Sequence, residues 1–274
     1  MKIINDSYLG ADTRYSLIDL EIPENFNKEI IIFIHGFMGF KDWGAWHLVQ
    51  AYFVNKGFGF CKFNTSHNGG TVEQAIDFDD LEAFGRNTYS KEIEDIQSVI
   101  KYIDSKKANW NGHLIGHSKG GAIAMIAGNQ FEKIKSISTW ASIASIENRF
   151  PKDKLLMEWK NKGVRFVKNG RTKQELPQYF NLYEDFEKNK SKYNLESLCK
   201  KYLKPISHFH GLEDTSVLPE NAVQLASWSK GNLNMMKETN HVFGSRHPWL
   251  ESKMPDSLEE LCFYTHQFIS EIKT

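Results

Sequence analysis

Hydrophobic residues along this chain follow two alternating patterns. Continuous apolar runs are typical of strands that are buried on both faces of a sheet, whereas apolar residues at helical spacing indicate helices. The clearest helical segment covers 90–107, where Ser90 is the expected start. One face of this segment carries its isoleucines: Ile93, Ile96, Ile100 and Ile103.

Several apolar runs are expected to be strands of one sheet. They are rich in β-branched and aromatic residues and lie at 29–36, 57–64, 110–116, 134–142, 206–211 and 232–238. Further helices are expected at 43–56, 120–130, 219–229 and 257–272. This alternation predicts an α/β fold, a mostly parallel sheet flanked by helices on both faces. Residues 2–22 are expected to add a short antiparallel hairpin at the edge of the sheet.

One long interval, 147–204, interrupts the alternation. It mixes aromatic residues with many lysines and contains no convincing buried strand. Because a segment of this length inside a compact domain is usually functional, we expect a partly helical cap over the carboxyl edge of the sheet. The chain is therefore divided into a core domain, 1–146 and 205–274, and a cap insertion, 147–204. The lysine-rich tail of the cap, 188–204, is expected to be a solvated helix face.

Composition narrows the class of protein. The 274 residues fit one large α/β domain, and 34 lysines and arginines balance 34 aspartates and glutamates. No net field therefore favours nucleic acid, a membrane surface or a polyanionic substrate. Cys61, Cys199 and Cys262 are far apart and form no CxxC pair, so we expect buried thiols. No apolar signal segment or membrane-length run occurs, so we expect a cytoplasmic protein. We expect it to be a monomer or a homodimer.

The segment 113–128, HLIGHSKGGAIAMIAG, places a serine in a glycine-flanked turn. Gly116 to Gly120 match G-x-S-x-G between a predicted strand and a predicted helix, which is the context of a nucleophile elbow. So sharp a turn forces strained backbone angles at the serine, and glycine on both sides avoids collisions. A plain turn or a phosphate loop is the alternative, but neither the P-loop nor the dinucleotide pattern occurs. The turn therefore predicts Ser118 as a nucleophile.

A serine hydroxyl needs a general base near neutral pH. We prefer His241, because it follows the last predicted strand, where a loop can return it to the sheet edge. His247, in the same loop region, is the alternative base. The histidines within predicted strands are expected to pack or to support the site: His35, His113, His208 and His210.

The base needs an acid that orients it and stabilises its charged form. Asp214 follows the second-last predicted strand and is preferred over its neighbour Glu213, although capping a turn or a helix is a common alternative role for aspartate. The order Ser118, Asp214, His241 is the one expected for this sheet architecture.

An oxyanion needs two hydrogen-bond donors. We expect the backbone N–H of Lys119, immediately after the nucleophile, and that of Phe37, in the loop after the first buried strand. Trp43 and Trp140 are proposed walls of the substrate pocket, and core packing is an equal alternative for both.

These motifs resemble the α/β-hydrolase superfamily. The resemblance rests on HGF at 35–37, GHSKGG at 116–121, GLEDTSV at 211–217 and NHVF at 240–243. The chain is most similar to bacterial dienelactone-hydrolase, cinnamoyl-esterase and prolyl-oligopeptidase-like serine hydrolases. It departs from a strict dienelactone hydrolase, whose nucleophile is cysteine, and has no room for the propeller domain of a prolyl oligopeptidase. The resemblance implies an α/β-hydrolase fold of eight strands, with the triad at the carboxyl edge and no metal or organic cofactor.

We therefore expect a serine esterase that cleaves small-molecule carboxylic esters of small to medium apolar acyl groups through a Ser-His-Asp triad and an acyl-enzyme. A peptidase or amidase of the prolyl-oligopeptidase-like type would use the same residues. A non-catalytic ligand-binding protein on the same fold is the other alternative.

Overall fold

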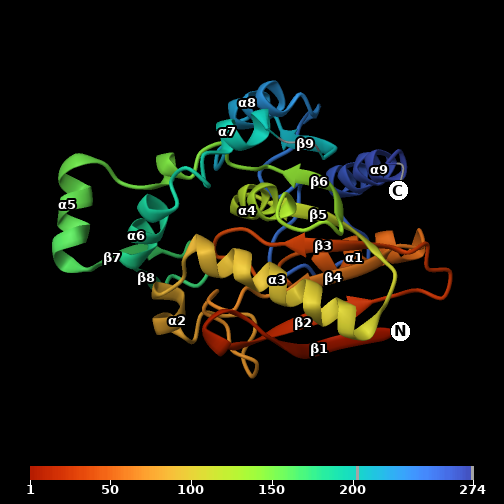
Figure 1. Cartoon of the computed structure of the whole chain (residues 1–274), viewed down its shortest axis with the longest axis horizontal. Helices are drawn as coiled ribbons and strands as arrows, with labels where there is room; N and C mark the ends of the chain where they lie inside the picture. Colours follow the sequence, from red (N-terminus) through yellow and green to blue (C-terminus); the bar gives the residue numbers. More distant parts are fainter. Residues whose placement is uncertain (202–203, 273–274) are drawn as a thin grey trace.

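The computed structural model describes residues 1–201 and 204–272 and is built around one large sheet (Figure 1). Its strands lie in the order β1-β2-β4-β3-β5-β6-β9-β10. Their bounds are β1 Lys2–Leu9, β2 Tyr15–Glu21, β3 Glu29–Ile34, β4 Gly59–Phe63, β5 Asn111–His117, β6 Ile134–Trp140, β9 Ile206–Gly211 and β10 Asn232–Met236. β1 and β2 pair antiparallel, and all pairs from β4 to β10 are parallel. The predicted mostly parallel sheet and its amino-terminal edge hairpin are confirmed.

Helices cover both faces of this sheet. These helices are α1 Trp46–Asn55, α3 Tyr89–Lys106, α4 Lys119–Gly128, α8 Glu220–Ser229 and α9 Asp256–Ser270. Two short helices, α2 Leu81–Gly85 and α7 Leu195–Lys200, pack outside these layers. Each long helix predicted from the sequence is present, with its ends shifted by a few residues. The start of α3 is one such shift: the Thr88 hydroxyl, not Ser90, accepts the hydrogen bond from the N–H of Lys91.

The central strand β3 shows why a continuous apolar run was the signal for this sheet. Successive side chains of a strand point to opposite faces. Ile30, Ile32 and Ile34 pack in the core cluster that includes residues of α3 and α4. Ile31 and Phe33 pack in the cluster that includes residues of α1 and α9. Both faces of β3 are therefore buried, as a strand in a covered parallel sheet requires.

The interval 147–204 contains more regular structure than expected. It holds a short 3₁₀ turn, η2 Glu147–Arg149, followed by α5 Asp153–Lys162, β7 Val164–Lys168, β8 Glu175–Tyr179 and α6 Asn181–Lys188. β7 and β8 form a separate two-stranded antiparallel sheet that the sequence did not predict. In Figure 1 the arrows of β3 and β6 point toward this segment. The division into a core and a cap remains a prediction.

The tail of that interval contains one short helix, α7, with an exposed and a buried side. Glu196, Ser197 and Lys200 are exposed, as expected for a solvated helix face, whereas Leu195 and Cys199 are buried where α7 packs against α4 and α8. Residues 202 and 203 of the predicted tail lie outside the described residues. All three cysteines are free and buried. Across residues 1–201 and 204–272, no helix has the length and apolar character that a bilayer crossing needs.

Candidate active site

Ser118 occupies the single residue between β5 and α4. Its backbone angles, φ 56° and ψ −121°, lie in a region that residues with a side chain rarely adopt. The Ser118 N–H donates to the carbonyl of Trp140 on β6 over 2.8 Å, which holds the turn against the neighbouring strand. The predicted strained strand-to-helix turn is present, and it presents the serine at the carboxyl end of β5.

The glycines beside Ser118 are required by close backbone approach. A Cβ atom on Gly116 would lie 2.2 Å from the carbonyl oxygen of Gly120. A Cβ atom on Gly120 would lie 2.3 Å from the carbonyl oxygen of Ile34 at the end of β3. Real Cβ atoms do not tolerate such distances, so only glycine lets α4 start this close to the two central strands.

Asp214 and His241 form a hydrogen-bonded pair. His241 Nδ1 lies 2.7 Å from Asp214 Oδ2. The other oxygen, Oδ1, accepts hydrogen bonds from the N–H groups of Ser216 and Val217, at 2.8 and 2.9 Å. The carboxylate is thus fixed from both sides, and the turn-capping role that was the alternative for Asp214 coexists with its bond to His241.

A second histidine contacts the same carboxylate. His210 Nε2 lies 3.1 Å from Asp214 Oδ2 and 2.8 Å from the carbonyl oxygen of Val217, so this nitrogen carries the proton. Burial raises the pKa of Asp214, but the hydrogen bonds from His210, His241 and the Val217 N–H outweigh it and hold the pKa well below its usual value. Asp214 is therefore an anion at neutral pH, able to fix the tautomer of His241.

Ser118 and His241 line one cavity of about 220 Å³. The side chain of His241 is 19 % exposed, so its ring reaches solvent while Asp214 behind it is buried. Within the described residues the Ser118 hydroxyl makes no hydrogen bond, and it is open toward this cavity. The structure thus joins the predicted acid and base directly and places the predicted nucleophile in the cavity that the base faces.

His117, immediately before the serine, supports the His241 loop. Its Nε2 lies 2.9 Å from the carbonyl oxygen of His241, and the two rings are 4.9 Å apart between centroids. Burial lowers the pKa of His117 to about 3, so the ring is neutral and donates this hydrogen bond. The sequence offered no signal for this contact, because it joins residues 117 and 241 across the folded chain.

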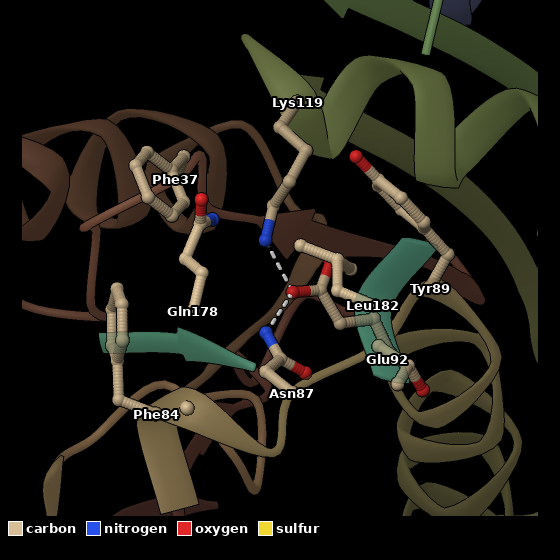
Figure 2. A pocket seen from close by; sticks show the side chains of 10 residues that line it. Phe37, Phe84, Asn87, Tyr89, Glu92, Lys119, Gln178 and Leu182 are labelled. Atoms are coloured by element: carbon tan, nitrogen blue, oxygen red, sulfur yellow. Dashed lines mark hydrogen bonds and ion pairs between the residues drawn. The ribbon is translucent and has the colours of Figure 1, made fainter. Parts of the chain in front are cut away.

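The side chain of Lys119, immediately after the serine, points toward Glu92 (Figure 2). Its ammonium pairs with the carboxylate of Glu92 on α3, which also accepts a hydrogen bond from Asn87 over 2.6 Å. The ammonium also lies 5.8 Å from the ring centroid of Phe37. The lysine side chain therefore ties α4 to α3.

The two predicted amide donors have no acceptor within the described residues. The N–H groups of Phe37 and Lys119 make no hydrogen bond there. The loop of Phe37 lies against the serine, because a Cβ atom on Gly36 would be 3.0 Å from Ser118 Cβ. Unpaired N–H groups beside a helix amino terminus favour a developing negative charge.

Two cavities meet at Ser118. The first is the His241 cavity described above, whose wall includes Trp43 and His117. The second is also about 220 Å³ in volume. Its wall combines Ser118 with residues of the 147–204 segment: Arg149, Phe150, Arg165, Val167, Gln178 and Leu182.

Trp140 corrects an expectation about the pocket. Its side chain is 0 % exposed and its indole N–H donates to the Thr265 hydroxyl over 3.0 Å, so it belongs to the core. β6 aims this side chain at the face covered by α1 and α9, where it packs against Phe33, Trp46 and Phe243.

The alternative base and acid make other contacts or are exposed. His247 Nδ1 accepts the N–H of Gly44 over 2.9 Å and its ring packs against Phe40 and Trp43. Glu213 is exposed. His35 lines the His241 cavity but is buried, and its Nε2 accepts the N–H of Thr65 over 3.1 Å.

Two more strand histidines are structural. His113 bonds to Ser136 and Glu29, and His208 bonds to Thr139 and Ser229. In the part of the chain that the structure describes, no three His, Cys, Asp or Glu side chains are grouped to hold a metal ion.

Comparisons with known proteins agree with this architecture. No family model matches the chain, and no curated protein matches its sequence. Est1E from Butyrivibrio proteoclasticus, with ferulic acid bound, is similar with a TM-score of 0.70 and 20% identity, over 97% of this chain and 98% of that chain. Mouse alpha/beta hydrolase domain-containing protein 10 gives a TM-score of 0.69 and 17% identity, over 97% and 99% of the two chains. The monoacylglycerol lipase of Paleococcus ferrophilus gives 0.66 and 15%, over 93% and 98%. At these identities the likeness shows the fold, and the chain has the α/β-hydrolase fold.

Proposed function

We propose that this protein is a serine hydrolase that cleaves carboxylic esters through Ser118, His241 and Asp214. The observation that supports this most directly is the 2.7 Å pairing of His241 with an ionised Asp214 in the wall of the cavity that Ser118 shares. A hydroxyl, an imidazole and a carboxylate in this relation form the apparatus of acyl transfer. The esterase and lipase names of the structural neighbours are consistent with the proposal.

The reaction uses each residue in turn. His241 Nε2 removes the proton from Ser118 as its oxygen bonds to the ester carbonyl carbon, and Asp214 stabilises the imidazolium that forms. The tetrahedral intermediate collapses when His241 returns the proton to the leaving alcohol, which breaks the ester bond and leaves an acyl-Ser118 enzyme. Water then adds to the acyl carbon with His241 again as the base, and release of the acid restores the serine.

The intermediate carries a negative oxygen that needs donors. The backbone N–H groups of Phe37 and Lys119 are the proposed pair, since they are unpaired beside Ser118 in the described structure. Donors of this kind contribute about 3 kcal/mol to lowering the barrier. The Lys119 side chain does not act on the substrate in this scheme, because its ammonium is paired with the carboxylate of Glu92.

The second cavity, which Ser118 shares with the 147–204 segment, suggests what the acyl part of the substrate is. Apolar side chains there suit a small to medium acyl group: Ile143, Phe150, Val167 and Leu182. A panel of p-nitrophenyl acyl esters and aminoacyl amides tests the assignment. We expect ester turnover to exceed amide turnover and to vanish in Ser118→Ala, whereas faster amide turnover would make the protein an amidase or peptidase. Absence of both activities would favour a binding protein.

A further inference from the structure

The cavity lined by Ser118 and the 147–204 segment has an uncompensated positive wall. Two guanidinium groups, those of Arg149 and Arg165, contribute to it, and none of its lining residues is acidic. Its third cation, Lys119, is already neutralised by Glu92. For the two arginines, no carboxylate lies within ion-pair distance anywhere in residues 1–201 and 204–272.

Arg165 is held in place by neutral groups only. Its Nε and Nη2 donate to the side-chain oxygen of Gln178 over 2.9 and 2.7 Å, and its guanidinium carbon lies 4.2 Å from the ring centroid of Trp159. Figure 2 shows the side chain of Gln178 beside that of Phe37. These contacts fix the guanidinium while leaving its Nη1 hydrogens without an acceptor in the described structure.

Another arginine near Ser118, Arg171, does have an acidic partner. Arg171 lines the other cavity, the one that contains His241, and its Nη2 is paired with Asp77 over 2.9 Å. Arg165 is partly buried and Arg149 is exposed. For Arg165 the lack of an anion is costly, because desolvation disfavours its charge. An anionic ligand that reaches both guanidinium groups would remove that cost at Arg165 through charge-assisted hydrogen bonds and would gain a further charged partner at Arg149.

The position of His241 assigns the two cavities to the two halves of an ester. The base must reach the leaving oxygen to protonate it. His241 lines the cavity with Trp43 and is absent from the lining of the cavity with the two arginines. The leaving alcohol therefore occupies the His241 side, and the acyl chain extends toward Arg149 and Arg165.

We infer that the acyl group of the substrate ends in a carboxylate bound by Arg149 and Arg165, so that the protein acts on half-esters of dicarboxylic acids. This inference rests on the proposed function and names its substrate class. The apolar side chains along the cavity contact the methylene chain, and the guanidinium groups bind the charged end.

Three ethyl esters with the same acyl chain length test the inference: monoethyl adipate, ethyl hexanoate and ethyl 6-aminohexanoate. They differ only in whether the far end of the chain is negative, neutral or positive. We expect wild-type kcat/KM for monoethyl adipate to exceed that for ethyl hexanoate at least about tenfold, as hydrogen bonds to a charged group allow. The cationic ester should be the poorest of the three. Equal or reversed rates for the adipate and hexanoate esters would overturn the inference and leave the esterase proposal standing.

Substitution of the two arginines tests whether they cause the preference for the adipate ester. Arg149→Gln and Arg165→Gln should each reduce the adipate-to-hexanoate ratio severalfold, and the double variant should bring it close to one. Lys154→Gln removes a charge from the same segment, where the side chain of Lys154 is 89% exposed, and should leave the ratio unchanged. A ratio that survives the double variant would also overturn the inference.

If no ester is hydrolysed, the proposed function is contradicted, and the inference about the carboxylate is then tested by measuring how tightly the esters bind. Calorimetry with Ser118→Ala should then show monoethyl adipate binding at least about tenfold more tightly than ethyl hexanoate, as a charge-assisted contact predicts. Equal binding, or no binding of either ester, would overturn the inference independently of catalysis.

Discussion

His210 Nε2 lies 3.1 Å from Asp214 Oδ2, the same oxygen that binds His241. The carboxylate therefore serves two imidazoles, one fully buried and one facing the cavity. Since His210 holds its proton on Nε2 by a second contact to the Val217 carbonyl, it donates to Asp214 without competing as a base. We regard His210 as a positioning residue that keeps Asp214 ionised and fixed.

Removing this donor should weaken catalysis while leaving the reacting groups in place. His210→Leu should lower kcat about tenfold with KM little changed, because a buried hydrogen bond to a charged group is lost. His210→Gln restores a donor and should recover part of the loss. Steady-state kinetics on a p-nitrophenyl ester measure both, and equal losses in the two variants would show that the role is only packing.

Substitutions of the adjacent acids Asp214 and Glu213 should have very different effects on kcat. Asp214→Asn keeps the size of the side chain but offers His241 the wrong hydrogen-bonding group, so kcat should fall by about 10³- to 10⁴-fold. Glu213→Gln, at an exposed neighbour, should change kcat less than about twofold, as most surface substitutions do. The reverse ranking in the same kinetic assay would reject Asp214 as the acid.

Glycine at 120 should be required for folding and not only for activity. Gly120→Ala places a Cβ atom 2.3 Å from the Ile34 carbonyl and should lower the free energy of unfolding by about 3 kcal/mol or more. Gly170→Ala is a matched control, since a Cβ atom there meets no neighbouring atom within 4 Å. Urea unfolding should show the control within about 1 kcal/mol of wild type. Similar losses at both sites would contradict the close-packed turn.

Acid should destabilise the fold partly through His208. Burial lowers the pKa of this residue to about 3, from about 6.5 in the unfolded chain. Below pH 6.5 the unfolded state therefore binds a proton that the native state does not, and stability is lost as the pH falls toward 3. The variant His208→Gln has no imidazole to take up this proton. Between pH 6 and 4 the slope of its unfolding free energy against pH should therefore be smaller than that of wild type by roughly 1 kcal/mol per pH unit. Urea unfolding at several pH values checks this, and parallel slopes would contradict it.

The sequence predicted the sheet because its inner parallel strands, from β4 to β9 in the sheet order, are buried on both faces and read as continuous apolar runs. β7 gave no such signal, since none of its residues is fully buried, and its partner β8 contains Pro177. The G-x-S-x-G turn could be recognised because its strain demands glycine locally.

The supporting contacts could not be foreseen in the same way. The contact of His117 with the His241 carbonyl joins distant parts of the chain through tertiary packing. The contact of Arg165 with Gln178 depends on the β7–β8 sheet, which was not predicted and in which these two residues lie opposite each other. For Trp140, at a strand end near the site, the sequence left a pocket wall and core packing as equal alternatives, and the direction of its side chain places it in the core. Facing direction at a strand end depends on register, which one sequence did not specify.

The most direct test of the account is covalent labelling by a fluorophosphonate probe, mapped by tandem mass spectrometry. Such probes report a serine oxygen that a neighbouring base can deprotonate beside an oxyanion site. We predict a single modified residue, Ser118, with labelling abolished in folded Ser118→Ala and greatly slowed in His241→Gln. An unlabelled wild-type protein, or labelling that persists in Ser118→Ala, would contradict the assignment of Ser118 as the nucleophile.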